Sequence, residues 1–171
     1  MMVLNTFVLA GQIIAMQTGL GFASIVDPVN GINVPAVGQF YLILATLLFW
    51  TLDGHLAMIH MIVLSFHAFP IGEAWWTGEQ FREIAHWGGW MFVSAITLSL
   101  APIVSLLIVN LAFGVMTKAA PQLNIFSIGF SIAQVMGLLI IWITLDNFTA
   151  HFETQWLRAE QFMCQLLRIC P

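Results

Sequence analysis

Residues 90–115 read WMFVSAITLSLAPIVSLLIVNLAFGV, and this stretch contains no charged side chain. It exceeds the roughly 20 apolar residues that an α-helix needs to cross the hydrocarbon of a bilayer. Three further apolar segments cover residues 1–25, residues 40–69 with an interruption at Asp53, and residues 123–145. Backbone groups in lipid are satisfied only in helices and closed barrels, and these runs lack the alternation of barrel strands. The sequence therefore predicts an all-α integral membrane protein with four main apolar helical segments.

The composition supports this class. Hydrophobic residues make up 60% of the 171 residues and charged residues 7%, and the mean hydropathy is +0.95. Soluble domains carry about 25% charged residues. The few charges lie between the apolar segments and near the C-terminus, so the net charge of -4 belongs to loops and tail. A water-soluble fold is excluded, and no nucleic-acid partner is expected.

The segment after the first apolar run is rich in residues that break helices. Asp27-Pro28, Asn30-Gly31 and Pro35 fall within nine positions of one another, and such pairs mark turns and loops. Irregular backbone at membrane depth is tolerated only where protein encloses it or where it lines a cavity. We expect an irregular loop that other helices surround.

Two further elements are amphipathic. Residues 77–87 predict a short helix at a membrane boundary, flanked by tryptophans, which favour that interface. Residues 146–169 predict a C-terminal helix that lies on a surface or against a partner. Pro102 lies inside the third apolar segment and should kink it, because proline removes a helical hydrogen bond.

Small residues suggest close helix packing. Gly11, Ala15, Gly19 and Ala23 follow one another at intervals of four in the first segment, which would leave a ridge that another backbone can approach closely. The segment 123–145 repeats this theme with Ser127, Ser131 and Gln134 on one face. Gly129 and Gly137 lie nearby.

Ionisable residues within a span are functional candidates. Asp53, His60 and His67 are spaced by seven, so a proton relay is one hypothesis. Seven residues correspond to about 10.5 Å along a helix, which is too far for direct transfer without intervening waters. Histidines that form hydrogen bonds at helix contacts are the alternative interpretation.

Catalysis is not indicated by any motif. An enzyme would need a nucleophile beside a base, metal ligands at helical spacing, or paired carboxylates. The sequence contains no GxSxG or HExxH motif, and Cys164 and Cys170 form neither a CxxC motif nor a zinc pattern. We expect no catalytic residue, no metal and no cofactor.

Two longer stretches carry a more specific signal. The first is GFASIVDP at residues 21–28, followed by Val34-Pro35 and by LDGH at residues 52–55. The second is APIV at residues 101–104, which leads to NLAFG at 110–114, PQLNIF at 121–126 and GF at 129–130. In this order and spacing the stretches resemble the FliR/SpaR/YscT family of type III secretion export-gate proteins. The resemblance covers nearly the whole chain.

This resemblance implies a non-enzymatic subunit of the flagellar export gate, a multi-pass protein of the bacterial inner membrane in the flagellar basal body. It implies FliP, FliQ and FlhB as partners and unfolded flagellar proteins in transit. Residues 1–171 would form one domain, in which the loop at residues 22–37 plugs the pore and residues 90–145 form a hairpin like FliQ. The resemblance assigns the plug to Phe22, Ile25, Val26, Asp27, Pro28, Asn30, Gly31, Val34 and Pro35. It adds Asn110 and Gly114 to the packing residues, and Lys118, Pro121, Gln122 and Asn124 to a hairpin tip at residues 116–124 that faces the cytoplasm.

Members of this family are longer and have additional N-terminal helices that this chain lacks, so we expect either a truncated product or an N-terminal part that is supplied separately. Two alternative functions remain. One is the homologous subunit of a virulence injectisome, and the other is a proton-coupled transporter that works through Asp53, His60 and His67.

Overall fold

The computed structural model describes residues 1–26, 33–68, 78–119 and 125–167. Most of these residues are helical, which confirms the predicted all-α class, and a small antiparallel pair of strands interrupts the helices. The elements are α1 (Met2–Thr18), η1 (Leu20–Phe22), β1 (Ser24–Val26), β2 (Asn33–Pro35), α2 (Ala36–Thr51), α3 (Gly54–Ala68), α4 (Gly78–Ala119), α5 (Ile125–Thr144), η2 (Leu145–Asn147) and α6 (Phe148–Leu166).

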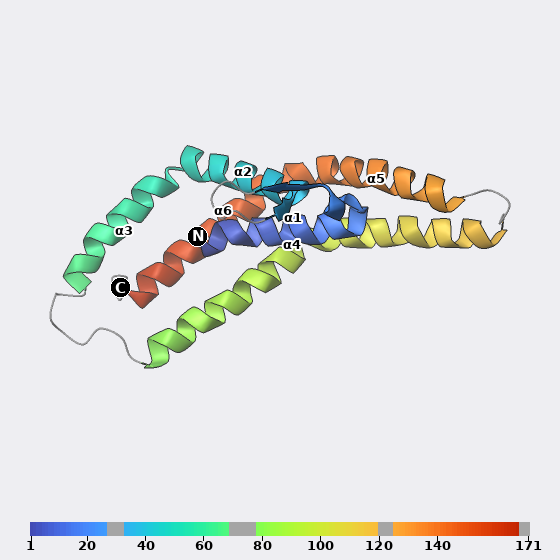
Figure 1. Cartoon of the computed structure of the whole chain (residues 1–171). Coiled ribbons are helices and arrows are strands. Elements are labelled where there is room, and N and C mark those ends of the chain that lie inside the picture. The colour runs from blue at the N-terminus through green and yellow to red at the C-terminus, as the bar shows by residue number, and fades with distance from the viewer. Residues whose placement is uncertain (27–32, 69–77, 120–124, 168–171) are drawn as a thin grey trace.

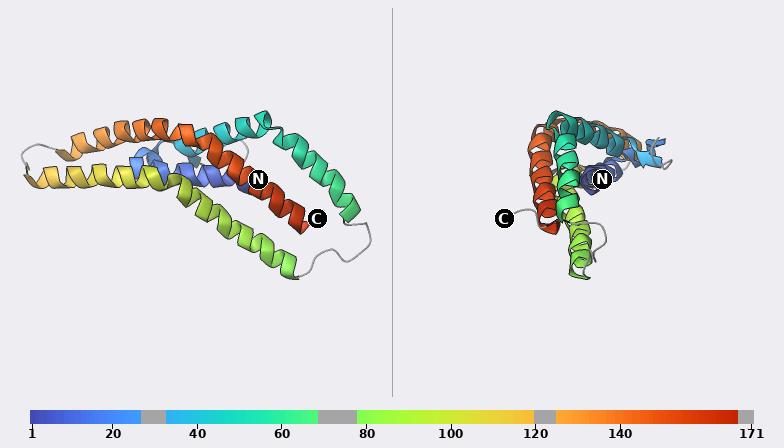
Figure 2. Two further views of the ribbon diagram at one scale, coloured as in Figure 1. Left: turned by 180° about the vertical axis from the view of Figure 1, so that it is seen from behind. Right: turned by 90° about the vertical axis from the view of Figure 1, so that its left-hand side faces the viewer.

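The helices form an elongated arrangement around α1. α4 and α5 make an antiparallel hairpin that extends away from the other helices, whereas α3, α6 and the first part of α4 diverge at the opposite end (Figure 1). The view from behind shows the same two ends (Figure 2). α1 packs mainly against α2 and α4. Small side chains on α1 allow both neighbours to approach closely.

An aromatic cluster joins α1, α2 and α6. The Phe7 ring lies 5.1 Å from Phe148 and 5.6 Å from Phe152, and the Tyr41 ring lies 5.3 Å from Phe148. All four side chains are buried, and the hydroxyl of Tyr41 shares a hydrogen bond with Thr144. Tilted and edge-on rings at these distances attract one another beyond their simple burial, so the cluster holds the C-terminal helix against the first two helices.

The first helix is shorter than the sequence analysis expected. A helix through residue 25 is wrong, because α1 ends at Thr18 and Gly19 adopts a left-handed conformation with φ 75°. This conformation is common at helix C-termini and favours glycine. The Thr18 hydroxyl donates to the Ala15 carbonyl and accepts from the Leu20 amide at 3.0 and 3.4 Å. These contacts turn the chain toward β1.

The second apolar segment breaks at Asp53, as predicted. α2 and α3 meet at an angle of 68°, and Asp53 between them has φ 55°. Its carbonyl accepts hydrogen bonds from the amides of Leu56 and Ala57 at 2.9 and 3.1 Å, which begins α3. α2 also starts at Ala36, four residues earlier than expected.

The expected separate helix at residues 77–87 is wrong. These residues, from Gly78 onward, form the start of a continuous helix α4 that runs to Ala119. Gly88 and Gly89, which link the amphipathic residues to the apolar span, are themselves helical. The two parts therefore form one helix. Pro102 lies inside this helix, and α4 changes direction near its middle (Figures 1 and 2). The predicted kink is therefore present.

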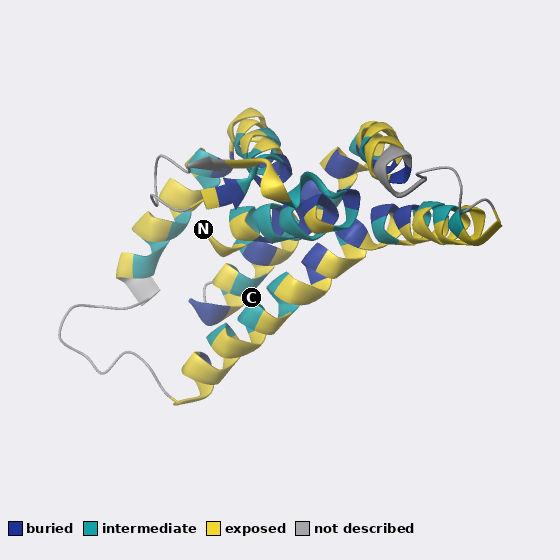
Figure 3. Ribbon diagram, turned by 45° about the vertical axis from the view of Figure 1, so that its right-hand side comes forward, coloured by how far each residue is buried: buried dark blue, intermediate teal, exposed yellow. Residues whose placement is uncertain are grey.

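Among the described residues, two helices are long and apolar enough to cross a membrane. The bent pair α2 and α3 would make a third span. The first is α4, and the second runs from Gly129 to Leu166 through α5, η2 and α6. Figure 3 shows that much of the outer surface of the α4–α5 hairpin is exposed. That surface is apolar, with Leu111, Val115, Val135 and Trp142 among its exposed side chains, as expected for contact with lipid or with other helices.

Candidate functional site

The candidate site is the loop between α1 and α2, of which the structure describes both ends. β1 and β2 pair antiparallel, with Ser24 opposite Pro35, Ile25 opposite Val34 and Val26 opposite Asn33. The Ala36 amide donates to the Ala23 carbonyl at 2.7 Å and closes the base of this ladder. We call residues 20–26 and 33–36 the stem of the loop. The paired backbone makes the stem a defined element and not a free linker.

Side chains on the stem point in different directions. Val34 is 3% exposed and packs into the protein, whereas Phe22 is 93% exposed and Asn33 is also exposed. Pro35 lies between these extremes. A phenylalanine ring that stays in contact with water loses the favourable free energy of apolar burial. Phe22 is therefore suited to contact lipid or a partner. The side chains of Ile25 and Val26 and all of Asp27, Pro28, Asn30 and Gly31 lie outside the described residues.

The second strand of the stem is anchored where α1 crosses α2. A Cβ atom on Gly11 would lie 2.6 Å from the Cα atom of Gly38 and 2.9 Å from the Val37 carbonyl oxygen. A Cβ atom on Gly38 would lie 3.2 Å from a methyl of Val34. Only glycine allows backbones to approach this closely. Thus the crossing fixes the start of α2 directly behind β2.

The predicted ridge of four small residues is shorter than expected. Gly11 and Ala15 lie on α1 and are buried, but Gly19 caps the helix and Ala23 is exposed in the stem. The ridge ends after Ala15 because the left-handed backbone of Gly19 stops the helical repeat. Gln12 contributes to the crossing through its Cγ, which would lie 3.4 Å from a Cβ on Gly38.

A cavity of about 460 Å³ lies between the end of α1 and the α4–α5 hairpin. Asn110 and Gly114 both line it and both are exposed, and a Cβ on Gly114 would meet nothing within 4 Å. Their predicted packing partners are therefore not supplied by the described part of the chain. The remaining lining residues come from the ends of three helices: Met16, Gln17, Thr18, Gly19, Phe113, Thr117, Gly129, Phe130 and Ala133.

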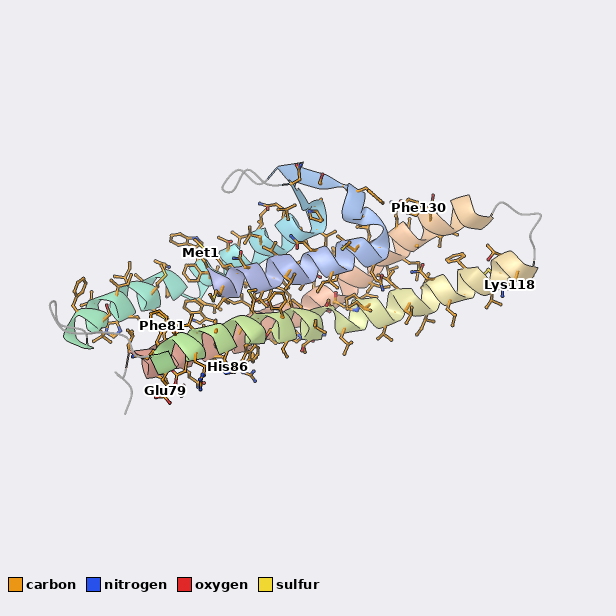
Figure 4. All side chains as sticks on the ribbon, turned by 60° about the horizontal axis from the view of Figure 1, so that its bottom comes forward. Met1, Glu79, Phe81, His86, Lys118 and Phe130 are labelled. Atoms are coloured by element: carbon orange, nitrogen blue, oxygen red, sulfur yellow. The ribbon has the colours of Figure 1, made fainter. Side chains whose placement is uncertain are left out.

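The tip of this hairpin is described only on one side. Lys118 is exposed in the last turn of α4 and lies at the far end of the molecule (Figure 4). Pro121, Gln122 and Asn124 lie outside the described residues. A cation at a helix C-terminus complements the helix dipole, so Lys118 also suits its position in the helix.

Of the residues of the relay hypothesis, Asp53 lies at the bend between α2 and α3, whereas His60 and His67 follow along α3. Asp53 and His60 are exposed, and the side chain of His67 lies outside the described residues. The described residues contain no group of three or more His, Cys, Asp or Glu side chains that could hold a metal ion. His55 was not singled out, yet its Nδ1 is buried and has no hydrogen-bond partner in the described structure. Its ring lies 4.6 Å from that of Trp50.

Sequence reasoning also missed the partners of the important glycines. Gly38 and Thr18 were not singled out and Phe130 appeared only as part of a motif, although they contact Gly11, Gly137 and Gly19 respectively. A small residue indicates that something approaches it, but the sequence does not name the approaching residue. Only the tertiary arrangement pairs them.

The geometry defines a class of protein first. The chain is a helical membrane protein in which apolar helices hold the paired stem of a loop.

The family follows from similarity to known proteins. The model for bacterial export proteins, family 1, matches residues 1–159, and the chain belongs to this family. This confirms the assignment made from its motifs, and the chain is a membrane component of an export family and not an enzyme.

Individual relatives agree with this family. The chain is 41% identical over 136 residues to the flagellar biosynthetic protein FliR of Pectobacterium carotovorum, covering 80% of this chain and 52% of the relative. It is 39% identical over 132 residues to FliR of Escherichia coli, covering 77% and 51%. The surface presentation of antigens protein SpaR of Shigella flexneri is 27% identical over 133 residues, covering 78% and 51%. The chain thus spans about half the length of these relatives.

Proposed function

We propose that the chain is a subunit of the flagellar protein export apparatus in the bacterial inner membrane, where it forms part of the export channel with FliP and FliQ and contacts FlhB. Unfolded flagellar proteins would pass through this channel. The observation that carries the proposal is an irregular loop whose stem is a paired ladder anchored on a glycine crossing, within a chain that belongs to an export family.

In this proposal the loop closes the pore. The closing segment is residues 22–37, and the stem supports this role because it holds the ends of the segment in one place. A flexible linker would not form a seal, because holding it in one position would remove its conformational entropy. The exposed ring of Phe22 is available to contact the opposite wall of a pore built by several subunits.

The α4–α5 hairpin supports assembly with similar subunits. Asn110 is an exposed amide in an otherwise apolar span, and such a group is satisfied in a membrane by a neighbouring helix. Gly114 lies four residues further and leaves open space beside it. Together they form a place where a helix of a neighbouring subunit, such as FliQ, can approach closely.

Deleting residues 27–35 tests the role of the loop. We expect the variant to co-purify with FliP and FliQ, and cells that contain it to leak ions or small fluorescent molecules across the membrane. Replacing the same residues with a glycine and serine linker of equal length separates the length of the loop from its side chains, and this variant should leak as well. An assembled deletion variant as tight as the unmodified complex would show that the loop is only a connector.

A second candidate function is the equivalent subunit of a virulence injectisome, which the similarity to SpaR supports. The higher identity to flagellar relatives favours the flagellar role. The chain can be expressed as a fusion with the part of a FliR relative that it does not align with. If this fusion restores motility to a strain that lacks its own FliR, the result would support the flagellar assignment. Restored needle secretion without motility would support the injectisome.

A further inference from the structure

The first strand of the stem is held by a different element from the second. At Gly19, where α1 ends, a Cβ atom would lie 2.7 Å from Cε2 and 3.2 Å from Cζ of Phe130. One edge of the Phe130 ring, a side chain that is 51% exposed, therefore touches the backbone at the point where α1 gives way to the stem. Figure 4 labels Phe130 on α5, beside the end of α1.

A second contact of α5 lies close to the first. A Cβ atom on Gly137 would lie 2.5 Å from Cγ2 and 2.9 Å from Cβ of Thr18, and Thr18 is 1% exposed. Phe130 and Gly137 are seven residues apart, which places them on one face of α5. This face runs along the end of α1 and contacts its last residue and its cap.

The connection from this contact to the loop is short. The Ala23 amide donates to the Leu20 carbonyl at 3.0 Å, which closes the 3-10 turn η1 directly after Gly19. The next residue, Ser24, already belongs to β1. A displacement of the Gly19 backbone would therefore displace β1 as well, because only residues 20–23 separate the two and a hydrogen bond joins Leu20 to Ala23.

We propose that Phe130 is a positioning residue for the loop, and that the α4–α5 hairpin sets the position of the first strand while the crossing of Gly11 and Gly38 sets that of the second. What this positioning means for closure of a pore rests on the proposed function of the loop.

Hydrogen exchange in the purified full chain tests this positioning role directly. The amide of Ala36, which donates to the Ala23 carbonyl, reports whether the stem is closed. In Phe130→Ala we expect this amide to exchange about tenfold faster, which corresponds to about 1.4 kcal/mol. Phe130→Leu keeps part of the contact and should give a smaller increase.

The matched control is Trp142→Ala, which removes a 76% exposed aromatic ring from the same helix. We expect it to leave the exchange of Ala36 within twofold of the unmodified chain. An unchanged rate in Phe130→Ala would overturn the proposal. An equal increase in both variants would also overturn it, because the effect would then come from general loosening of α5.

The two proposals can fail separately. The exchange measurement needs no assembled pore, so its failure would leave the leak test of the loop deletion unaffected. A deletion variant that does not leak would remove the pore-closing role but leave the contact between Phe130 and the stem. If both hold, Phe130→Ala in the assembled complex should leak, and Trp142→Ala should not.

Discussion

Replacing Gly11 with alanine should destabilise the chain, because the added methyl would meet backbone and not a movable side chain. The new Cβ would lie 2.6 Å from the Cα atom of Gly38, and ordinary contact begins at 3.4 Å, so α1 and α2 must separate by 0.8 Å. Overpacking of this kind costs about 1–3 kcal/mol. Alanine recovers up to about 1 kcal/mol as a better helix former. The net loss should be about 0–2 kcal/mol, which is about 1–3 kcal/mol relative to a glycine-to-alanine change in a helix that creates no clash.

Unfolding with SDS from mixed micelles, followed by tryptophan fluorescence, measures this free energy. Gly114→Ala is the matched control, because it makes the same change in a helix where the new Cβ meets nothing within 4 Å. It should be neutral or stabilise the isolated chain by up to about 1 kcal/mol. A Gly11→Ala variant as stable as the Gly114→Ala variant would refute the close backbone crossing.

Further predictions concern the core, the kink and the interface between α4 and α6. Phe152→Ala should cost about 3–5 kcal/mol in the same assay, because removal of the fully buried ring leaves a cavity; Leu157→Ala, at an exposed position of α6, should cost less than about 0.5 kcal/mol. Pro102→Ala should straighten α4 by restoring a backbone hydrogen bond, and the distance between spin labels at the two ends of α4 should increase; an unchanged distance would show that packing bends the helix. Arg158→Gln should cost up to about 1 kcal/mol, since the guanidinium lies 4.5 Å over the Trp90 ring at an exposed position, and Trp90→Leu should cost less in the Arg158→Gln variant than in the unmodified chain; an equal cost in both would show that the two side chains do not interact.

The packing proposed for Asn110 and Gly114 differs in kind from that at Gly11. Gly11 already has its partner within the chain, whereas Gly114 has open space. The same substitution should therefore affect stability at Gly11 and assembly at Gly114. This contrast separates the residues that build the chain from those that are available to neighbouring subunits.

Much of the helical architecture was readable from the sequence. Long uncharged runs must be helical in lipid, and the break at Asp53 and the kink at Pro102 follow from a charge and a missing amide. The helix boundaries were less reliable. The expected helix to residue 25 failed because Gly19 takes a left-handed conformation, and the expected boundary after Trp87 failed because Gly88 and Gly89 remain helical in α4.

The residues alone place this chain among helical membrane proteins of an export family and predict a loop rich in helix breakers after the first helix. How that loop is held depends on contacts between elements that lie far apart in the sequence. Gly11 meets Gly38 and Gly19 meets Phe130 across long separations in sequence, and periodicity describes one helix face without naming the face that covers it. A helix forms from local hydrogen bonds, whereas the position of the loop depends on which backbones can approach each other closely.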